Sequence, residues 1–222
     1  MMLRNTLAQV VRLHSPRRRV LLLAGLLSVV SLATTAAVGW PLWAITLAGL
    51  LPWLPVFGAE MIWVRHHYDW LALFYLLVVG QGGHVLEHLA QMLQIHLLGL
   101  QPVHAHGVFG ALDIEWVHFV WNTSVLVAVL LLSARYRRNR WLWLALVFAG
   151  WHQAEHIYVF SIYLQTGVPG NPGLLARGGA LGGGLPLTRP DLHFLYNLVE
   201  TTPIVLGFVY QCRLLLQHPE RG

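Results

Sequence analysis

The chain has 222 residues, of which 56% are hydrophobic and only 10% are charged, and its formal net charge is +5 at pH 7. Soluble domains carry about 25% charged residues, so this deficit indicates that lipid is the solvent for much of the surface. The 14 basic residues are all arginines near the ends of apolar segments, a pattern typical of membrane proteins and not of nucleic-acid-binding surfaces.

Six apolar segments are long enough to cross a bilayer as helices, which takes about 20 residues each. Their length and their lack of apolar–polar alternation argue against strands. We therefore predict an all-α integral membrane protein with six transmembrane helices. In chain order, the predicted spans cover residues 20–39, 42–64, 70–98, 113–133, 141–165 and 192–215. Asp113 and Asp191 stand at the start of the fourth and sixth spans, where we expect them to cap the helices.

The arginines predict the direction of the spans. Twelve of the 14 fall on one side of the six-span arrangement, and only Arg177 and Arg189 fall on the other. By the positive-inside rule, both termini face the cytoplasm, and we expect the inner (plasma) membrane of a bacterial-type cell. The segment from Arg17 through the first span also fits a cleavable secretory signal, which would leave the other five spans unchanged.

The composition divides the chain into three regions. We predict a basic cytoplasmic N-terminus at residues 1–19, a two-helix membrane unit at 20–68, and a metal-binding four-helix bundle at 69–222. Within the bundle, repeat one covers residues 69–138 and repeat two covers 139–216.

The two repeats rest on a pair of duplicated motifs. The third and fifth spans each contain H-x-x-E-H, at residues 84–88 and 152–156, and the fourth and sixth each contain H-F-x-aromatic-N, at 118–122 and 193–197. The motifs occur in the same order, so spans 3–4 and 5–6 are predicted to be a duplicated hairpin. Because each unit has an even number of spans, the repeats are parallel and form a pseudo-twofold four-helix bundle.

Helix geometry gathers the polar residues of these motifs. Residues three and four apart share a helix face, so each of the four helices presents a polar stripe. Lipid cannot accept these stripes, and we expect them to face one another inside the bundle. From the span directions, all four motifs lie on the non-cytoplasmic side of the membrane midplane.

Six imidazoles with nearby carboxylates suit a transition-metal site, and inward Glu and His pairs hold dinuclear sites in soluble bundles. We predict two metal ions, with iron favoured over copper or zinc. The predicted ligands are His84, Glu87, His88, His118, His152, Glu155, His156 and His193. By symmetry, the first three histidines would hold one ion and the last three the other, with the two glutamates bridging the ions or orienting imidazoles.

Other polar residues on the same faces have predicted supporting roles. Gln91, Asn122 and Asn197 are expected to orient the ligands through hydrogen bonds. Glu200 and Glu115 are predicted to be catalytic, Glu200 as a proton carrier or an extra ligand. The two outer loops, residues 99–112 and 167–190, are expected to be irregular, and the second is either a flexible connector or a lid over the site.

These features favour a membrane oxidoreductase acting on a hydrophobic small molecule, with the bilayer and a substrate or redox partner as its contacts. The chain resembles histidine-box desaturases and hydroxylases in being polytopic and histidine-rich. Their boxes are H-x-x-x-H and H-x-x-H-H; His84/His88 and His152/His156 fit the first, but nothing fits the second, so the chain is not assigned to that family.

Two alternative functions stay open. Paired inward histidines also suit a b-type haem protein for electron transfer, although the glutamate inside each pair argues against a haem face. Intramembrane His and Glu are likewise expected in a metal-ion or proton transporter. The cytoplasmic halves of the fourth and fifth spans are almost wholly apolar, at residues 125–132 and 141–148, which argues against a transport path.

Overall fold

The structure is a computed structural model that describes residues 18–110 and 114–217. The described residues form helices and loops, and extended backbone pairs among them at one isolated bridge, between Gly179 and Gly183. The prediction of an all-α chain is therefore confirmed. Most of the predicted basic N-terminus (1–19), and Asp113, lie outside the described residues. The chain divides into two compact units, the first comprising Met1–Leu76 with Val209–Gly222 and the second comprising Leu77–Phe208.

The first unit contains one continuous helix followed by a second helix that is interrupted in its middle. Its helices are α2 (Arg18–Ala37), α3 (Leu42–Leu50), the 3₁₀ helix η1 (Leu51–Trp53) and α4 (Leu54–Tyr68). The second predicted span was expected as one continuous helix. It is interrupted at η1 because Pro52 and Pro55 have no N–H to donate to the preceding turn.

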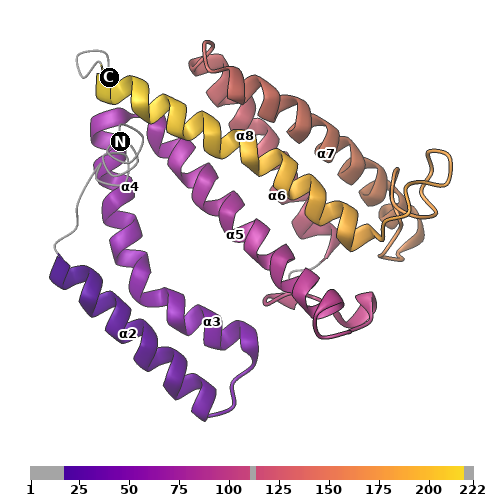
Figure 1. Ribbon diagram of the computed structural model, residues 1–222, viewed down its shortest axis with the longest axis horizontal. Helices are drawn as coiled ribbons and strands as arrows, with labels where there is room; N and C mark the ends of the chain where they lie inside the picture. Colours follow the sequence, from indigo (N-terminus) through magenta and orange to yellow (C-terminus); the bar gives the residue numbers. More distant parts are fainter. Residues whose placement is uncertain (1–17, 111–113, 218–222) are drawn as a thin grey trace. The chain divides into compact units, whose positions relative to one another are not determined.

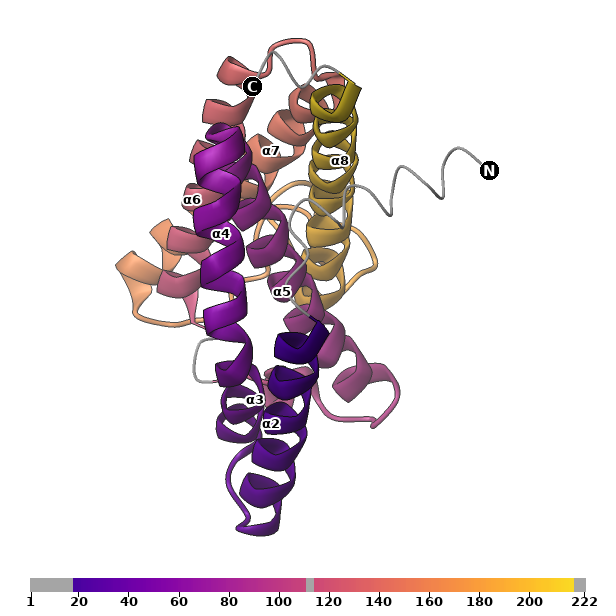
Figure 2. The ribbon, with the colours of Figure 1, turned by 90° about the vertical axis from the view of Figure 1, so that its left-hand side faces the viewer.

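Helices α2 and α3 lie side by side (Figures 1 and 2) and approach closely. Ser28 Oγ donates to the carbonyl oxygen of Gly49 at 2.5 Å, and a Cβ on Gly49 would lie 2.7 Å from the Leu32 side chain. The outer surface of α2 is apolar: Leu22 and Leu26 are each 62% exposed. An apolar surface of this kind is stable in lipid and not in water.

The second unit holds most of the other four long helices. These are α5 (Trp70–His96), α6 (Glu115–Arg135), α7 (Arg140–Thr166) and α8 (Arg189–Gln217), with a short 3₁₀ helix η2 (Pro102–His104) between α5 and α6. Figure 1 shows the four long helices running alongside one another. Their buried apolar core is formed by Val125, Val129, Leu132, Leu142, Ala145, Ala149 and Ile204.

Among the described residues, five helical segments are long and apolar enough to cross a membrane. They are Arg18–Ala37, Leu42–Tyr68, Trp70–His96, Glu115–Arg135 and Arg189–Leu215. Each matches one of the six predicted spans. The remaining predicted span corresponds to α7, which has 27 residues but is less apolar because it carries His152, Gln153, Glu155 and His156, all buried.

The start of α8 differs from the expectation in one detail. Asp191 was expected to be the N-cap, but the helix begins at Arg189, so the cap is Thr188. Thr188 N donates to Asp191 Oδ2 at 3.3 Å, and Asp191 N donates to Thr188 Oγ1 at 3.4 Å. This reciprocal pair is a capping box, in which the acidic residue stands three positions after the cap.

Candidate metal centre

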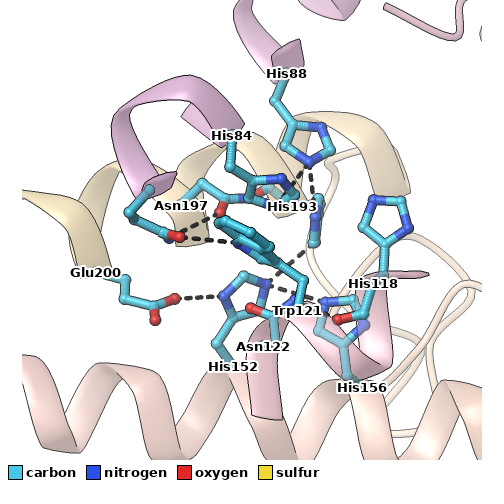
Figure 3. A network of polar contacts seen from close by, with 11 residues as sticks. His84, His88, His118, Trp121, Asn122, His152, His156, His193, Asn197 and Glu200 are labelled. Carbon is cyan, nitrogen blue, oxygen red and sulfur yellow. Dashed lines mark hydrogen bonds and ion pairs between the residues drawn. The ribbon is translucent and has the colours of Figure 1, made fainter. Parts of the chain in front are cut away.

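Six histidines from four helices converge inside the second unit, as Figure 3 shows. They form two groups of ligand atoms, and within each group all atoms lie within 4.8 Å of one another. The first group is His84, His88, His118 and His193; the second is His152, His156 and His193. All six belong to the duplicated motifs. The grouping differs from the division expected by symmetry, because His193 is shared by both groups.

The imidazole nitrogens are closely spaced. Nε2 of His88 lies 3.3 Å from Nε2 of His84 and 3.1 Å from Nε2 of His193. Nε2 of His152 lies 3.2 Å from Nε2 of His156 and 3.2 Å from Nδ1 of His193. Ligand nitrogens on one tetrahedral or octahedral ion are separated by about 3.0–3.4 Å when each metal–nitrogen distance is about 2.1 Å. The observed spacing fits metal coordination.

The aromatic residue of each H-F-x-aromatic-N motif packs on the first histidine of the preceding motif. The ring centroid of Trp121 lies 5.4 Å from that of His84, and the ring centroid of Tyr196 lies 5.5 Å from that of His152. Trp121 Nε1 also donates to Gln81 Oε1 at 3.0 Å. In both motif copies, the large aromatic ring thus fixes the position of an imidazole.

The asparagine of each motif has the same contact in both copies. Asn122 Nδ2 donates to the carbonyl oxygen of His118 at 2.9 Å, and Asn197 Nδ2 donates to that of His193 at 3.0 Å. The expectation was that these asparagines orient the histidines. Their contact is with the histidine backbone, so any such effect acts on the helix turn that carries the ring.

Three histidines are oriented through Nδ1. His88 Nδ1 donates to Gln91 Oε1 at 3.2 Å, while Gln91 Nε2 donates to the carbonyl oxygen of Ala105. His118 Nδ1 donates to the carbonyl oxygen of Ile114 at 3.1 Å. In a neutral imidazole, donation from Nδ1 leaves the lone pair on Nε2, the form that binds a metal. Gln91 is thus hydrogen-bonded to one of the predicted ligands.

The third of these histidines, His152, is oriented by a carboxylate. Its Nδ1 lies 2.6 Å from Glu200 Oε2, and the two side chains are each 1% exposed (Figure 3). Glu200 does not belong to either ligand group. A carboxylate that accepts from Nδ1 fixes the tautomer and makes Nε2 a stronger donor to a metal.

Glu87 and Glu155 were predicted to bridge the metal ions or to orient imidazoles. In the structure, each binds the loop that follows its helix. Glu87 Oε1 accepts from Phe109 N at 2.6 Å, and Glu155 Oε1 accepts from Leu174 N at 2.8 Å. Neither carboxylate belongs to the two ligand groups. The signal for this role in the sequence is weak, because the loop residues present only backbone N–H groups.

A glycine lies against each of these carboxylates. Gly107 has φ +70° and Gly173 has φ +80°, and a Cβ on either would overlap the carboxylate of Glu87 or of Glu155, respectively. Only glycine combines this left-handed backbone with such a close approach. In both copies, the carboxylate of the H-x-x-E-H motif and a glycine of the following loop thus make the same close contact.

Replacing Gly173 with alanine tests this anchor. We expect a loss of about 1 kcal/mol from the positive φ and about 1–3 kcal/mol more because Glu155 must move. The control is Gly182→Ala, where φ is +63° but nothing lies within 4 Å of the added Cβ. Thermal unfolding in detergent measures both variants. Equal loss in the two would show that the Glu155 contact contributes nothing.

Glu115 lies in an ion pair. Its two oxygens accept from Arg189 Nη1 and Nη2, each at 2.7 Å, and its Oε1 also accepts from Gly170 N at 3.2 Å. The predicted catalytic role is therefore not reflected in its contacts, which join α6 to the start of α8 and to the loop between α7 and α8.

That loop, residues 167–188, is irregular as predicted, and it is closed by hydrogen bonds of its own. Arg177 N donates to the carbonyl oxygen of Leu187, and Gly178 N to that of Gly183, each at 2.8 Å. Between the loop, α7 and α8 is a small pocket. Its lining is Glu155, His156, Val159, Pro172, Ala176, Arg189, Leu192, His193 and Tyr196. His156 and His193, two members of the second histidine group, thus line this pocket.

Comparison of the chain with described protein families, with curated proteins and with solved structures gives no match. The function is accordingly argued from the chemistry of the site. Within the described residues, the other histidines of the second unit, His96, His104 and His106, belong to neither ligand group.

Proposed function

We propose that this chain is a multi-pass membrane metalloprotein that binds two transition-metal ions at the six motif histidines and acts as an oxidoreductase on a hydrophobic small molecule. The observation that carries the proposal is the convergence of six imidazoles, with neighbouring nitrogens 3.1–3.3 Å apart. Burying so many polar rings is costly unless each finds a partner, and two cations would supply partners for all of them.

The ligand chemistry supports a redox-active metal. The sites offer imidazole nitrogen with no thiolate, a donor set that suits iron, copper or zinc. Iron is our first choice, as expected from the sequence. Glu200 beside His152 and Glu155 beside the pocket lie outside both ligand groups but would offset part of the charge of the ions. Oxygen-dependent hydroxylation or desaturation would use such a centre. The small pocket beside His156 and His193 lies next to this centre.

The proposal includes six spans, with α7 as the fifth in chain order. What supports α7 is the division of its faces: its polar residues are buried, whereas Val147, Ile157 and Leu164 are 66%, 54% and 60% exposed. The equivalent Trp121 and Tyr196 contacts support the pseudo-twofold bundle. The arginine distribution supports cytoplasmic termini and a bacterial-type inner membrane, so the loop side of the site would face outward.

The packing favours ions over haem b. A haem with two axial histidines holds them on opposite faces of a wide macrocycle. Here the imidazoles face one another directly, and His118 and His156 stack with interplanar angle 3° at 5.9 Å between ring centroids. A macrocycle between them would have to displace several of the six rings.

The packing also favours a closed site over a transport path. On the side of the site away from the loops, the bundle interior is mostly apolar: Val129, Leu132, Leu142 and Ile204 are all 0% exposed, and the buried Ser133 and Asn139 are hydrogen-bonded to backbone carbonyl oxygens. An ion or a proton crossing the bundle needs polar groups along its way.

The test is the metal content and optical spectrum of the purified protein. We expect about two iron or copper ions for each chain and no Soret band. His84→Ala and His152→Ala should each lose metal. His104→Ala, which removes an exposed histidine outside both ligand groups, should keep it. A Soret band, or a protein without metal that tolerates both substitutions, would contradict the proposal.

A further inference from the structure

His193 lies where the two ligand groups meet. Its Nε2 is 3.1 Å from Nε2 of His88, on α5, and its Nδ1 is 3.2 Å from Nε2 of His152, on α7. The described residues contain no other histidine that belongs to both groups. Figure 3 shows its ring between the two sets, with contacts on opposite edges.

The hydrogen bonds of its two neighbours create a mismatch at His193. His88 Nδ1 donates to the Gln91 oxygen and His152 Nδ1 donates to Glu200, so in their neutral forms both rings direct an Nε2 lone pair at His193. A neutral His193 has one N–H and can donate to only one of them. The other contact would join two lone pairs at about 3 Å, which is repulsive.

A metal ion on each side removes the mismatch. An ion accepts both lone pairs that face it, and the nitrogen distances of 3.1–3.3 Å are those of neighbouring ligands on one ion. For both nitrogens of His193 to be ligands, the ring must give up its remaining N–H proton, which passes to water as the second ion binds.

We infer that His193 bridges the two metal ions as an imidazolate. Its Nε2 binds the ion that His84 and His88 hold. Its Nδ1 binds the ion that His152 and His156 hold. The inference rests on the proposed binding of two ions and adds how they are joined. The negative imidazolate also offsets part of the charge that two cations bring into a buried site.

The counterpart of His193 in the other motif copy cannot bridge in this way. His118 Nδ1 donates to the carbonyl oxygen of Ile114, so His118 offers only Nε2 as a ligand. The bridge is therefore a feature of one repeat only, and it explains why one histidine group has four members and the other three.

The experiment loads the full-length protein in detergent with copper(II) alone, and measures copper content and the low-temperature EPR spectrum. Copper(II) binds imidazole sites strongly and carries one unpaired electron. We expect about two copper ions for each chain, about 6 Å apart as the ring width and two metal–nitrogen bonds dictate. Coupling through the imidazolate should reduce the EPR signal well below that of two isolated ions.

Variants identify the bridging residue. His193→Ala should remove the coupling and restore ordinary copper signals, whereas His118→Ala removes a ligand and should keep the coupling. If His193→Ala does not fold, the coupling in the wild-type protein still decides. Two uncoupled ions, or coupling that survives in His193→Ala, would overturn the bridge alone. A protein that binds one copper ion or none would overturn both the bridge and the proposed two-ion function.

Discussion

Replacing Glu200 with leucine should weaken the binding of one of the two metal ions by about 10–100-fold, the usual cost of losing the partner that orients a histidine ligand. The carboxylate lies 2.6 Å from His152 Nδ1, and both groups are 1% exposed. Without it, the buried Nδ1–H has no acceptor from α8, and the tautomer that carries the proton on Nε2 becomes competitive. That tautomer cannot bind metal through Nε2.

A matched variant separates this effect from a general loss of packing. Gln91→Leu removes the acceptor for His88 Nδ1. It should lower the affinity for the ion that His88 holds and leave the affinity for the ion that His152 holds close to that of the wild type. Glu200→Gln keeps an acceptor but removes the charge, so we expect a loss of about tenfold or less. Competition titrations against a chelator give the two affinities. If Glu200→Leu binds both ions with wild-type affinity, Glu200 does not position His152.

The helices and the gathering of the histidines could be predicted because both depend on short-range periodicity. An apolar run of about 20 residues determines a membrane helix almost by itself. The spacing of three and four residues places His84 and His88 on one face, as it does His152 and His156. Because lipid does not solvate polar side chains, the polar faces of the helices pack against one another.

The partners of the carboxylates could not be predicted, because loop conformation decides them. Glu87 and Glu155 accept from backbone N–H groups 22 and 19 residues away, and backbone groups leave no mark in the sequence. The glycines at Gly107 and Gly173 are the only trace of these contacts. They are hard to distinguish among 21 glycines until the positive φ and the nearby carboxylate are both known.

The sharing of His193 also lies beyond sequence reasoning. The duplicated motifs imply an equal division of six histidines, three to each ion. The residues around the motifs also differ between the repeats: the position of Glu200 is occupied by Val125 in repeat one, and the position of Gln91 by Val159 in repeat two. Whether the helices of the two repeats are related by exact twofold symmetry depends on the contacts between helices, and short sequence motifs do not predict these contacts.

Replacing Arg189 with methionine should destabilise the protein by about 2–4 kcal/mol, because it leaves the Glu115 carboxylate buried without its cation. Arg189 donates to both oxygens of Glu115 at 2.7 Å. The Glu115 side chain is 5% exposed and that of Arg189 is 29% exposed. The loss should therefore fall toward the lower end of the range for a fully buried pair.

Two further variants show whether the buried charge is the cause. In Glu115→Gln/Arg189→Met the charge is gone, and most of the lost stability should return. Arg177→Met, on the same side of the bundle but exposed, should change stability by less than about 0.5 kcal/mol. Unfolding in mixed detergent micelles measures all three. If the double variant is as unstable as Arg189→Met, the lost stability comes from packing at the start of α8 and not from the buried charge. The ion pair would then have no part in holding the loop of residues 167–188 over the histidines.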